Sequence, residues 1–157
     1  MVFLLAVLAI VGLGLRSKYP MPALDDAILE LADGDLDGPE RRRMLRITLD
    51  AAMTSESTTH AWAGMLAAIA LEDRTGYAAL LARLGGGPMP TVVPPEPQRE
   101  LLHLGDPLLG NLSNAMIAEA AGERALSGRI WRQVAAQCRL SPRPFAAELA
   151  HAGVQRH

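Results

Sequence analysis

The feature that most limits how this chain can fold is an uninterrupted apolar segment at its N-terminus. The fourteen residues 2–15 carry no charge, and Arg16, Lys18 and Tyr19 follow closely. A membrane-spanning helix normally has about 20 apolar residues, and fourteen span only roughly 21 Å of a hydrocarbon layer of about 30 Å. Basic side chains that reach the headgroups and an interfacial tyrosine reduce this shortfall. We therefore predict a single-pass membrane anchor in residues 1–19.

Two other interpretations of this segment stay open. A cleaved secretory signal has basic residues before its apolar run and a small-x-small cleavage site after it, and the sequence has neither. A buried or interfacial helix normally keeps some polar positions, and this segment has none. For the preferred anchor, the predicted membrane-contacting residues are Phe3, Leu4, Leu5, Leu8, Ile10, Leu13, Arg16, Lys18 and Tyr19.

The basic residues indicate an orientation for the anchor. Apart from the terminal amine nothing basic precedes it, whereas Arg16, Lys18 and a cluster at residues 41–46 follow it. Because basic residues accumulate on the cytoplasmic side of membrane proteins, we expect the N-terminus outside and the body in the cytoplasm. The single cysteine, Cys138, agrees with a reducing compartment and excludes an internal disulfide.

The residues that follow the anchor predict an all-α fold. The chain has 26 Ala and 25 Leu but only 7 Val, 6 Ile and six aromatic residues. Alanine and leucine lose little freedom in a helix, whereas sheets draw on the β-branched and aromatic residues that are scarce here.

Periodicity and turn residues divide the body into two small helical subdomains, at residues 20–84 and 99–157. In the first, we expect a helix that ends at Gly34, a second near residues 39–53, a third capped within residues 55–58 and a fourth at residues 77–84. The Gly/Pro-rich segment 85–98 contains five prolines in residues 88–97, which predicts an extended linker.

The second subdomain is predicted to contain four helices. The first covers residues 99–104, and Asp106-Pro107 begins the next. Ser127 is expected to cap the third, and Ser141-Pro142 to open the last, which would end at Gly153. Two units of about sixty residues bury little of their surface, so we expect a partner. The predicted partner-packing residues are Trp62, Tyr77, Trp131 and Phe145.

Asp33, Asp35 and Asp37 form a weak candidate for a calcium site. The segment Asp-Gly-Asp-Leu-Asp-Gly matches the opening of a calcium loop, in which alternating carboxylates converge on the ion. The match then fails, because the twelfth position, which needs a bidentate carboxylate, is Met44. We interpret the segment as an acidic turn in which Asp37 caps the next helix, and we expect no bound metal.

The sequence contains no recognisable catalytic set. Its four histidines are scattered, and it lacks a phosphate-binding loop, a dinucleotide fingerprint and a nucleophile elbow. Cys138 lies in a helical pattern as a small core residue. We therefore expect a protein that is not an enzyme, with no cofactor and no small-molecule substrate.

Residues 134–149 are similar to a helix-turn-helix, and residues 129–157 contain five arginines against one glutamate. Two features count against DNA recognition. Arg139 occupies the turn position where glycine is usual, and the supposed reading helix offers Ala146, Ala147 and Ala150, which cannot hydrogen-bond to bases.

The sequence thus favours a non-catalytic, membrane-anchored accessory subunit that packs against a larger membrane protein complex and the lipid bilayer. Energy-transducing membrane complexes often carry subunits of this kind. The alternative is a membrane-tethered DNA-binding regulator with a C-terminal helix-turn-helix-like unit, although nucleic acid is not the partner we expect.

Overall fold

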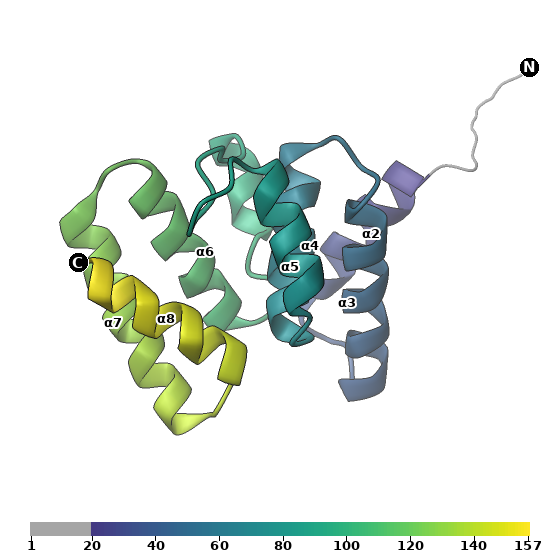
Figure 1. The fold of residues 1–157 in the computed structure, drawn as a ribbon. Coiled ribbons are helices and arrows are strands. Elements are labelled where there is room, and N and C mark those ends of the chain that lie inside the picture. Colours follow the sequence, from purple (N-terminus) through teal and green to yellow (C-terminus); the bar gives the residue numbers. More distant parts are fainter. Residues whose placement is uncertain (1–19) are drawn as a thin grey trace, which may run out of the picture.

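A computed structural model describes residues 20–157, and within them every regular element is a helix, which confirms the all-α prediction (Figure 1). Seven are α-helices and one is a 3-10 helix. They are α2 (Pro20–Asp33), α3 (Gly38–Ala52), α4 (Thr58–Ala70), α5 (Arg74–Arg83), η1 (Glu96–Leu101), α6 (Pro107–Ala120), α7 (Arg124–Leu140) and α8 (Pro144–Arg156).

The helices form two neighbouring groups. Each helix of α2–α5 packs mainly on the helix before and after it, and the same holds for α6–α8, while α4 also contacts α6 and α8. Figure 1 shows α2 and α3 at one end of the molecule and α7 and α8 at the other. The buried apolar side chains of both groups form one continuous cluster.

The central helix, α4, is buried along almost its whole length. All side chains from Thr59 to Ile69 are buried, and most of them are apolar. A helix that is apolar all round lies inside a protein rather than at its surface, because it has no polar face for water. Gly64 lets α3 approach closely, since a Cβ there would lie 2.4 Å from the Cβ of Ala52.

Side-chain caps fix where several helices begin. Asp37 accepts a hydrogen bond of 2.9 Å from the Glu40 N–H at the start of α3, as the sequence predicted. Asp73 caps α5 and Asp106 caps α6 through bonds of 2.8 and 2.9 Å. Each cap satisfies a backbone N–H that has no partner inside its own helix.

Two predicted helix boundaries in the C-terminal half were wrong. Ser127 does not begin a helix: α7 starts at Arg124, because Gly122 takes a left-handed turn (φ 79°) after α6. Gly153 does not end α8 but lies inside it, where its missing side chain leaves room for the ring of Trp131; a Cβ would lie 2.3 Å from that ring.

The segment predicted to be an extended linker packs on the body. Residues 96–98 belong to η1, and Met89 is buried. The indole N–H of Trp62 donates a hydrogen bond of 2.8 Å to the carbonyl of Val92. The proline-rich stretch therefore follows a defined path across α4, which a sequence without its tertiary contacts does not reveal.

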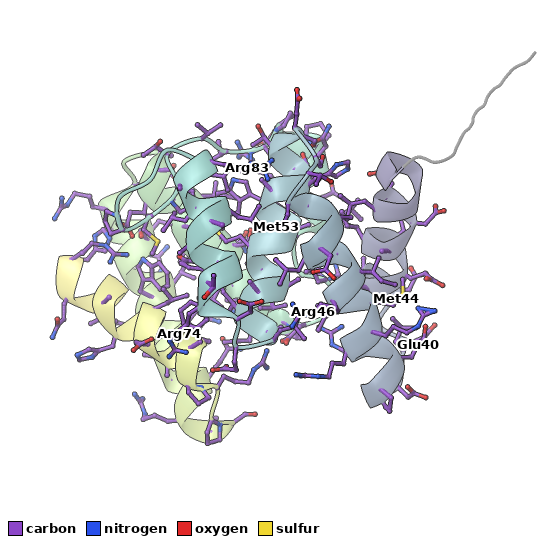
Figure 2. The ribbon with its side chains drawn as sticks, turned by 45° about the vertical axis from the view of Figure 1, so that its right-hand side comes forward. Glu40, Met44, Arg46, Met53, Arg74 and Arg83 are labelled. Atoms are coloured by element: carbon purple, nitrogen blue, oxygen red, sulfur yellow. The ribbon has the colours of Figure 1, made fainter. Side chains whose placement is uncertain are left out.

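Arginine side chains connect helices that are not adjacent in the chain (Figure 2). Arg46 of α3 lies 3.1 Å from Asp73, the cap of α5. Arg83 of α5 donates to the carbonyl of Ala52, at 2.7 Å, and to that of Ser55, in the loop after α3. The Ala52 carbonyl lies at the C-terminus of α3, where a cation is favourable.

The predicted membrane anchor, residues 1–19, lies outside the described residues. Among residues 20–157, no helix combines the length and the apolar character that crossing a membrane requires.

Candidate functional site

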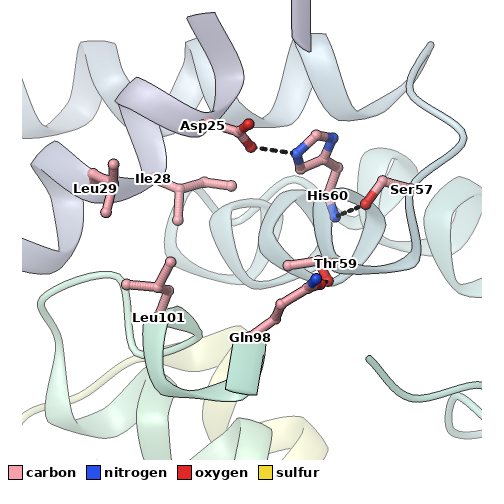
Figure 3. A pocket seen from close by; sticks show the side chains of 8 residues that line it. All are labelled: Asp25, Ile28, Leu29, Ser57, Thr59, His60, Gln98 and Leu101. Atoms are coloured by element: carbon pink, nitrogen blue, oxygen red, sulfur yellow. Dashed lines mark hydrogen bonds and ion pairs between the residues drawn. The ribbon is translucent and has the colours of Figure 1, made fainter. Parts of the chain in front are cut away.

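A cavity with a partly polar lining lies between α2, the start of α4 and η1 (Figure 3). Its volume is about 430 Å³. One side is apolar and the other carries hydroxyl, amide, carboxylate and imidazole groups; the lining residues are Asp25, Ile28, Leu29, Ser57, Thr59, His60, Gln98 and Leu101. A mixed lining of this kind is the usual starting point for a binding or catalytic hypothesis.

His60 is the central polar group of this cavity. Only 5% of the residue is exposed. Its Nδ1 lies 2.7 Å from the hydroxyl of Ser55, and its Nε2 lies 2.6 Å from Oδ1 of Asp25 on α2. The ring therefore connects the loop before α4 to α2, with both nitrogens hydrogen-bonded.

The local sequence explains why the imidazole lies there. Ser57 is the N-cap of α4, and its hydroxyl accepts the backbone N–H of His60 at 3.3 Å. The Ser55 hydroxyl in turn accepts the N–H of Ser57 at 3.2 Å. Serines before a helix commonly bind backbone N–H groups in this way. Here the cap holds the backbone of His60 and so orients its side chain.

The row Ser55, His60, Asp25 has the residue types of a hydrolytic triad, but its surroundings support a structural role. A nucleophile has to face the substrate, whereas Ser55 is only 8% exposed and does not line the cavity. The carboxylate partner is the exposed member, because 63% of the Asp25 side chain is accessible. That is the reverse of a triad, in which the acid is buried and the hydroxyl is open.

The far side of the cavity is closed by a contact between α4 and η1. The hydroxyl of Thr59 donates to the side-chain carbonyl of Gln98. Together with His60, this contact holds α2, α4 and η1 around the cavity, so its polar groups are used within the fold.

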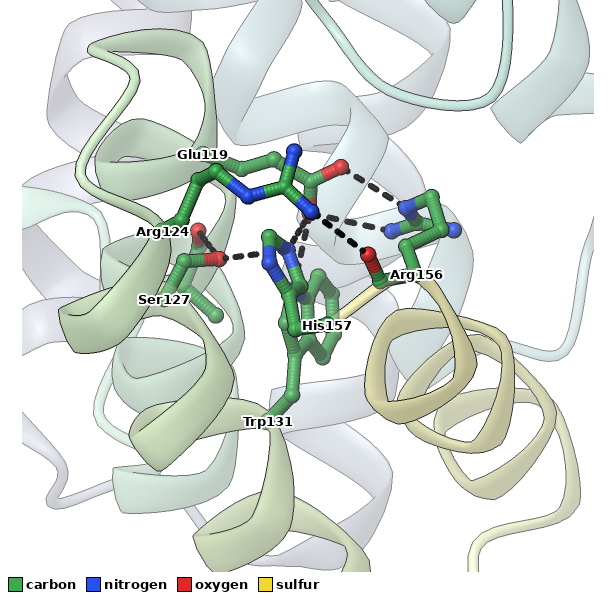
Figure 4. Close-up of polar contacts among 7 residues, drawn as sticks. Glu119, Arg124, Ser127, Trp131, Arg156 and His157 are labelled. Atoms are coloured by element: carbon green, nitrogen blue, oxygen red, sulfur yellow. Dashed lines mark hydrogen bonds and ion pairs between the residues drawn. The ribbon is translucent and has the colours of Figure 1, made fainter.

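A second polar cluster joins the three C-terminal helices (Figure 4). Glu119 of α6 accepts hydrogen bonds from the indole N–H of Trp131, at 2.9 Å, and from Nε of Arg156, at 2.7 Å. Burial raises the pKa of Glu119, but the bonds from Arg156 and Trp131 outweigh it, so the pKa lies below its ordinary value. The ring of His157 lies 3.4 Å from the same carboxylate.

A third cluster joins the two helix groups at the turn between α4 and α5. Glu72 has a left-handed backbone (φ 60°), and its carboxylate accepts the N–H of Phe145, at 3.2 Å, at the start of α8. The Phe145 ring meets Tyr77 edge-on at 5.0 Å, and the guanidinium of Arg74 lies 4.6 Å from its centre. Burial raises the pKa of Tyr77 to about 12.

The residues predicted to pack on a partner lie inside the chain's own core. Trp62 and Trp131 are fully buried, and Phe145 and Tyr77 are 5% and 6% exposed. These four side chains fill the interiors of the helix groups and the junction between them. In the described part of the chain they are therefore not on the surface that a partner would meet.

The other predicted site residues are placed as follows. Asp33 ends α2 and Asp37 caps α3, and no three acidic, histidine or cysteine residues within 20–157 converge to hold a metal ion. Cys138 is buried, and burial raises the pKa of its thiol. The nine predicted anchor residues, from Phe3 to Tyr19, fall outside the described residues.

Sequence reasoning missed the contact between Asp25 and His60. The two residues are 35 positions apart, so no local spacing connects them. The available signal was the pair of serines before His60, which indicates a capped helix start with the imidazole in its first turn.

Comparison of the chain with protein-family models, with curated proteins and with solved structures finds no match.

Proposed function

We propose that this chain is a non-catalytic, membrane-anchored accessory subunit that packs against a larger membrane protein complex and supports its assembly or stability. Residues 1–19 form its single-pass anchor, with the N-terminus outside. Residues 20–84 and 99–157 form two small helical subdomains on the cytoplasmic side.

The observation that carries this proposal is how the polar side chains of the cavity are used. Both nitrogens of His60 are hydrogen-bonded, the Ser57 hydroxyl caps α4, and Thr59 binds Gln98. Each bond joins one helix to its surroundings. Groups used in this way support a rigid body that presents surfaces rather than a reaction centre.

The apolar segment 2–15 supports the anchor, because its fourteen residues carry no charge and basic side chains follow it at Arg16 and Lys18. Arg41, Arg42 and Arg43 follow α2, and the positive-inside rule then favours the cytoplasmic side for the body.

The anchor is tested in the full-length chain with two matched substitutions. Leu8→Arg places a charge in the middle of the apolar segment, which costs about 2.5–3.5 kcal/mol on insertion scales. Leu140→Arg makes the same change at a side chain that is 90% exposed. After an alkaline wash of membranes, we expect the wild type and Leu140→Arg to stay in the membrane fraction and Leu8→Arg to be released. Release of the wild type would contradict the anchor.

The accessory role is tested by mild detergent extraction of the tagged full-length chain from its own membranes. We expect larger membrane proteins to co-purify with it in a fixed ratio. A chain that stays in the membrane but purifies alone would contradict the accessory role while leaving the anchor intact.

A further inference from the structure

The antiparallel hairpin of α7 and α8 carries a basic groove on its outer side. The groove has a volume of about 360 Å³ and is lined by Arg132, Ala135, Arg139, His151 and Val154. Its floor is apolar, and its rim carries two guanidinium groups and an imidazole. Arg129 lies one turn before Arg132 on the same helix. The groove therefore combines apolar contact with positive charge.

Unlike Arg143 and Arg156, the two groove arginines have no acidic partner in the described part of the chain. Arg143 pairs with Asp106 at 2.8 Å, and Arg156 pairs with Glu119 at 2.7 Å. Within residues 20–157, no carboxylate lies in ion-pair distance of Arg132 or Arg139.

The one acid of α7 and α8 does not neutralise the groove. Glu148 is engaged elsewhere, because it lies 2.7 Å from Arg74 of α5. The charge of the groove is therefore uncompensated by the described chain.

An exposed apolar side chain follows one of the groove arginines in the chain. Leu140, the last residue of α7, is 90% exposed and follows Arg139 directly. An exposed leucine next to unpaired arginines fits an occupant that offers both carboxylates and apolar side chains. It fits the phosphate backbone of a nucleic acid less well, since phosphates offer no apolar surface.

A surface with carboxylates and an exposed apolar side chain lies on α2, at the other end of the molecule. An exposed stripe of α2 carries Asp26, Leu29, Glu30 and Asp33 at the i, i+3, i+4, i+7 spacing, and Leu29 also borders the cavity described above. All four are exposed, and Leu29 is exposed by 49%. Among the described residues, none of the three carboxylates has an ion-pair partner.

We propose that α2 of one copy docks into the α7–α8 groove of a second copy. The stripe supplies carboxylates for the arginine rim and Leu29 for the apolar floor. Figure 1 shows α2 at one end of the molecule and α7 and α8 at the other, so α2 cannot reach the groove of its own chain. The contact is head-to-tail, which closes into a ring or continues as a chain of copies. It goes beyond the proposed accessory role and does not depend on it.

Exposed ion pairs contribute little singly and are screened by salt. The contact is therefore expected to be weak in dilute solution and sensitive to ionic strength. Copies held in one membrane would meet at a higher effective concentration.

The test uses the full-length chain with two different tags, co-expressed and extracted in mild detergent at low salt. One variant, Arg132→Glu with Arg139→Glu, makes the groove acidic. The other, Glu30→Arg with Asp33→Arg, makes α2 basic. We expect either variant alone to lose at least tenfold in capture of its own differently tagged copy. A mixture of the two variants should regain capture, because each offers the charge that the other needs.

The matched control is Arg42→Glu with Arg43→Glu, which makes the same charge change at α3. It should capture itself like the wild type. Recovery in the mixture also shows that both variants are folded. Wild-type copies that do not capture each other would overturn the proposal, as would variants that keep self-capture. Binding of a non-associating wild type to duplex DNA or to anionic vesicles, lost with Arg132→Glu, would assign the groove to that ligand instead and overturn it too.

Discussion

The two helix groups bury their apolar side chains in different ways. In α2–α5, one helix, α4, is buried on all sides, and the helices around it need only one apolar face each. In α6–α8, the long helix α7 has one buried stripe and an exposed basic face, and Trp131 fills the space between the helices. The first group thus forms around a central buried helix, whereas the second has no such helix and Trp131 is the largest side chain of its core.

The two groups also differ in where their polar side chains make contacts. In the first group, several polar side chains cap helix starts, as with Ser57 and Asp73, and single contacts such as that of Arg46 with Asp73 join the helices. In the second, a charged network centred on Glu119 lies next to the indole that fills the core. The stability of the C-terminal group should therefore depend more on pH and on a few residues.

The largest expected effect comes from removing the indole that organises α6–α8. Trp131→Ala should lower the free energy of unfolding by about 3–5 kcal/mol, because the side chain is fully buried. Urea unfolding followed by circular dichroism measures the loss. Hydrogen exchange shows whether protection falls in α4 as well, as one continuous core requires. Protection that falls only in α6–α8 would show two independent groups.

The next effect tests the charged network. Glu119→Gln should reduce stability at neutral pH by about 1.5–3 kcal/mol, the range for hydrogen bonds to a charged group. The folded pKa of Glu119 is lowered, so its contribution is fully present above the unfolded value of about 4.5 and is lost as pH falls through the folded pKa. Wild type and variant should therefore converge in acid. A stability difference that does not change with pH would show that the charge is irrelevant.

A smaller effect compares two turns with the same hydrogen-bond pattern. Glu72 and Gly122 both take left-handed conformations after a helix. Gly122→Ala should cost about 1 kcal/mol, because a side chain strains that conformation. Glu72→Gly should change stability less, since the relief of strain is offset by loss of the bond to the Phe145 N–H. Thermal unfolding of both variants measures the difference, and a large gain for Glu72→Gly would mean that this bond contributes nothing.

The smallest single effect is expected for the exposed carboxylate of the cavity, which can be compared with the buried histidine that it contacts. Asp25→Asn should lower stability by less than about 1 kcal/mol, since this carboxylate is 63% exposed. His60→Ala removes a buried ring bonded on both sides and should cost about 1–3 kcal/mol. Urea midpoints give both values. An Asp25 effect as large as that of His60 would point to a role for the carboxylate beyond holding α2.

The sequence predicts the helices well where local chemistry decides them. Gly34, Asp37 and the Asp106-Pro107 pair mark boundaries within one or two residues, since turn and cap geometry depend on neighbouring residues only. Ser127 and Gly153 mislead because their roles are tertiary. The Ser127 hydroxyl binds the carbonyl of Ala115 on α6 at 3.2 Å, and Gly153 makes room for Trp131.

The candidate site was beyond sequence reasoning for the same reason. The cavity depends on α2, α4 and η1 meeting, and Asp25 and His60 belong to different helices. The basic character of α7 and α8 is visible in the sequence. The sequence does not show which of these arginines are paired. Arg143 and Arg156 are paired because Asp106 and Glu119, at the start and end of α6, lie next to them.

The most direct test of the central claim is native mass spectrometry of the full-length chain after mild extraction from its own membranes. The account predicts the 16.8 kDa chain in fixed stoichiometry with larger membrane proteins. A chain found only as a free monomer, with neither lipid-embedded partners nor retention in the membrane, would contradict it.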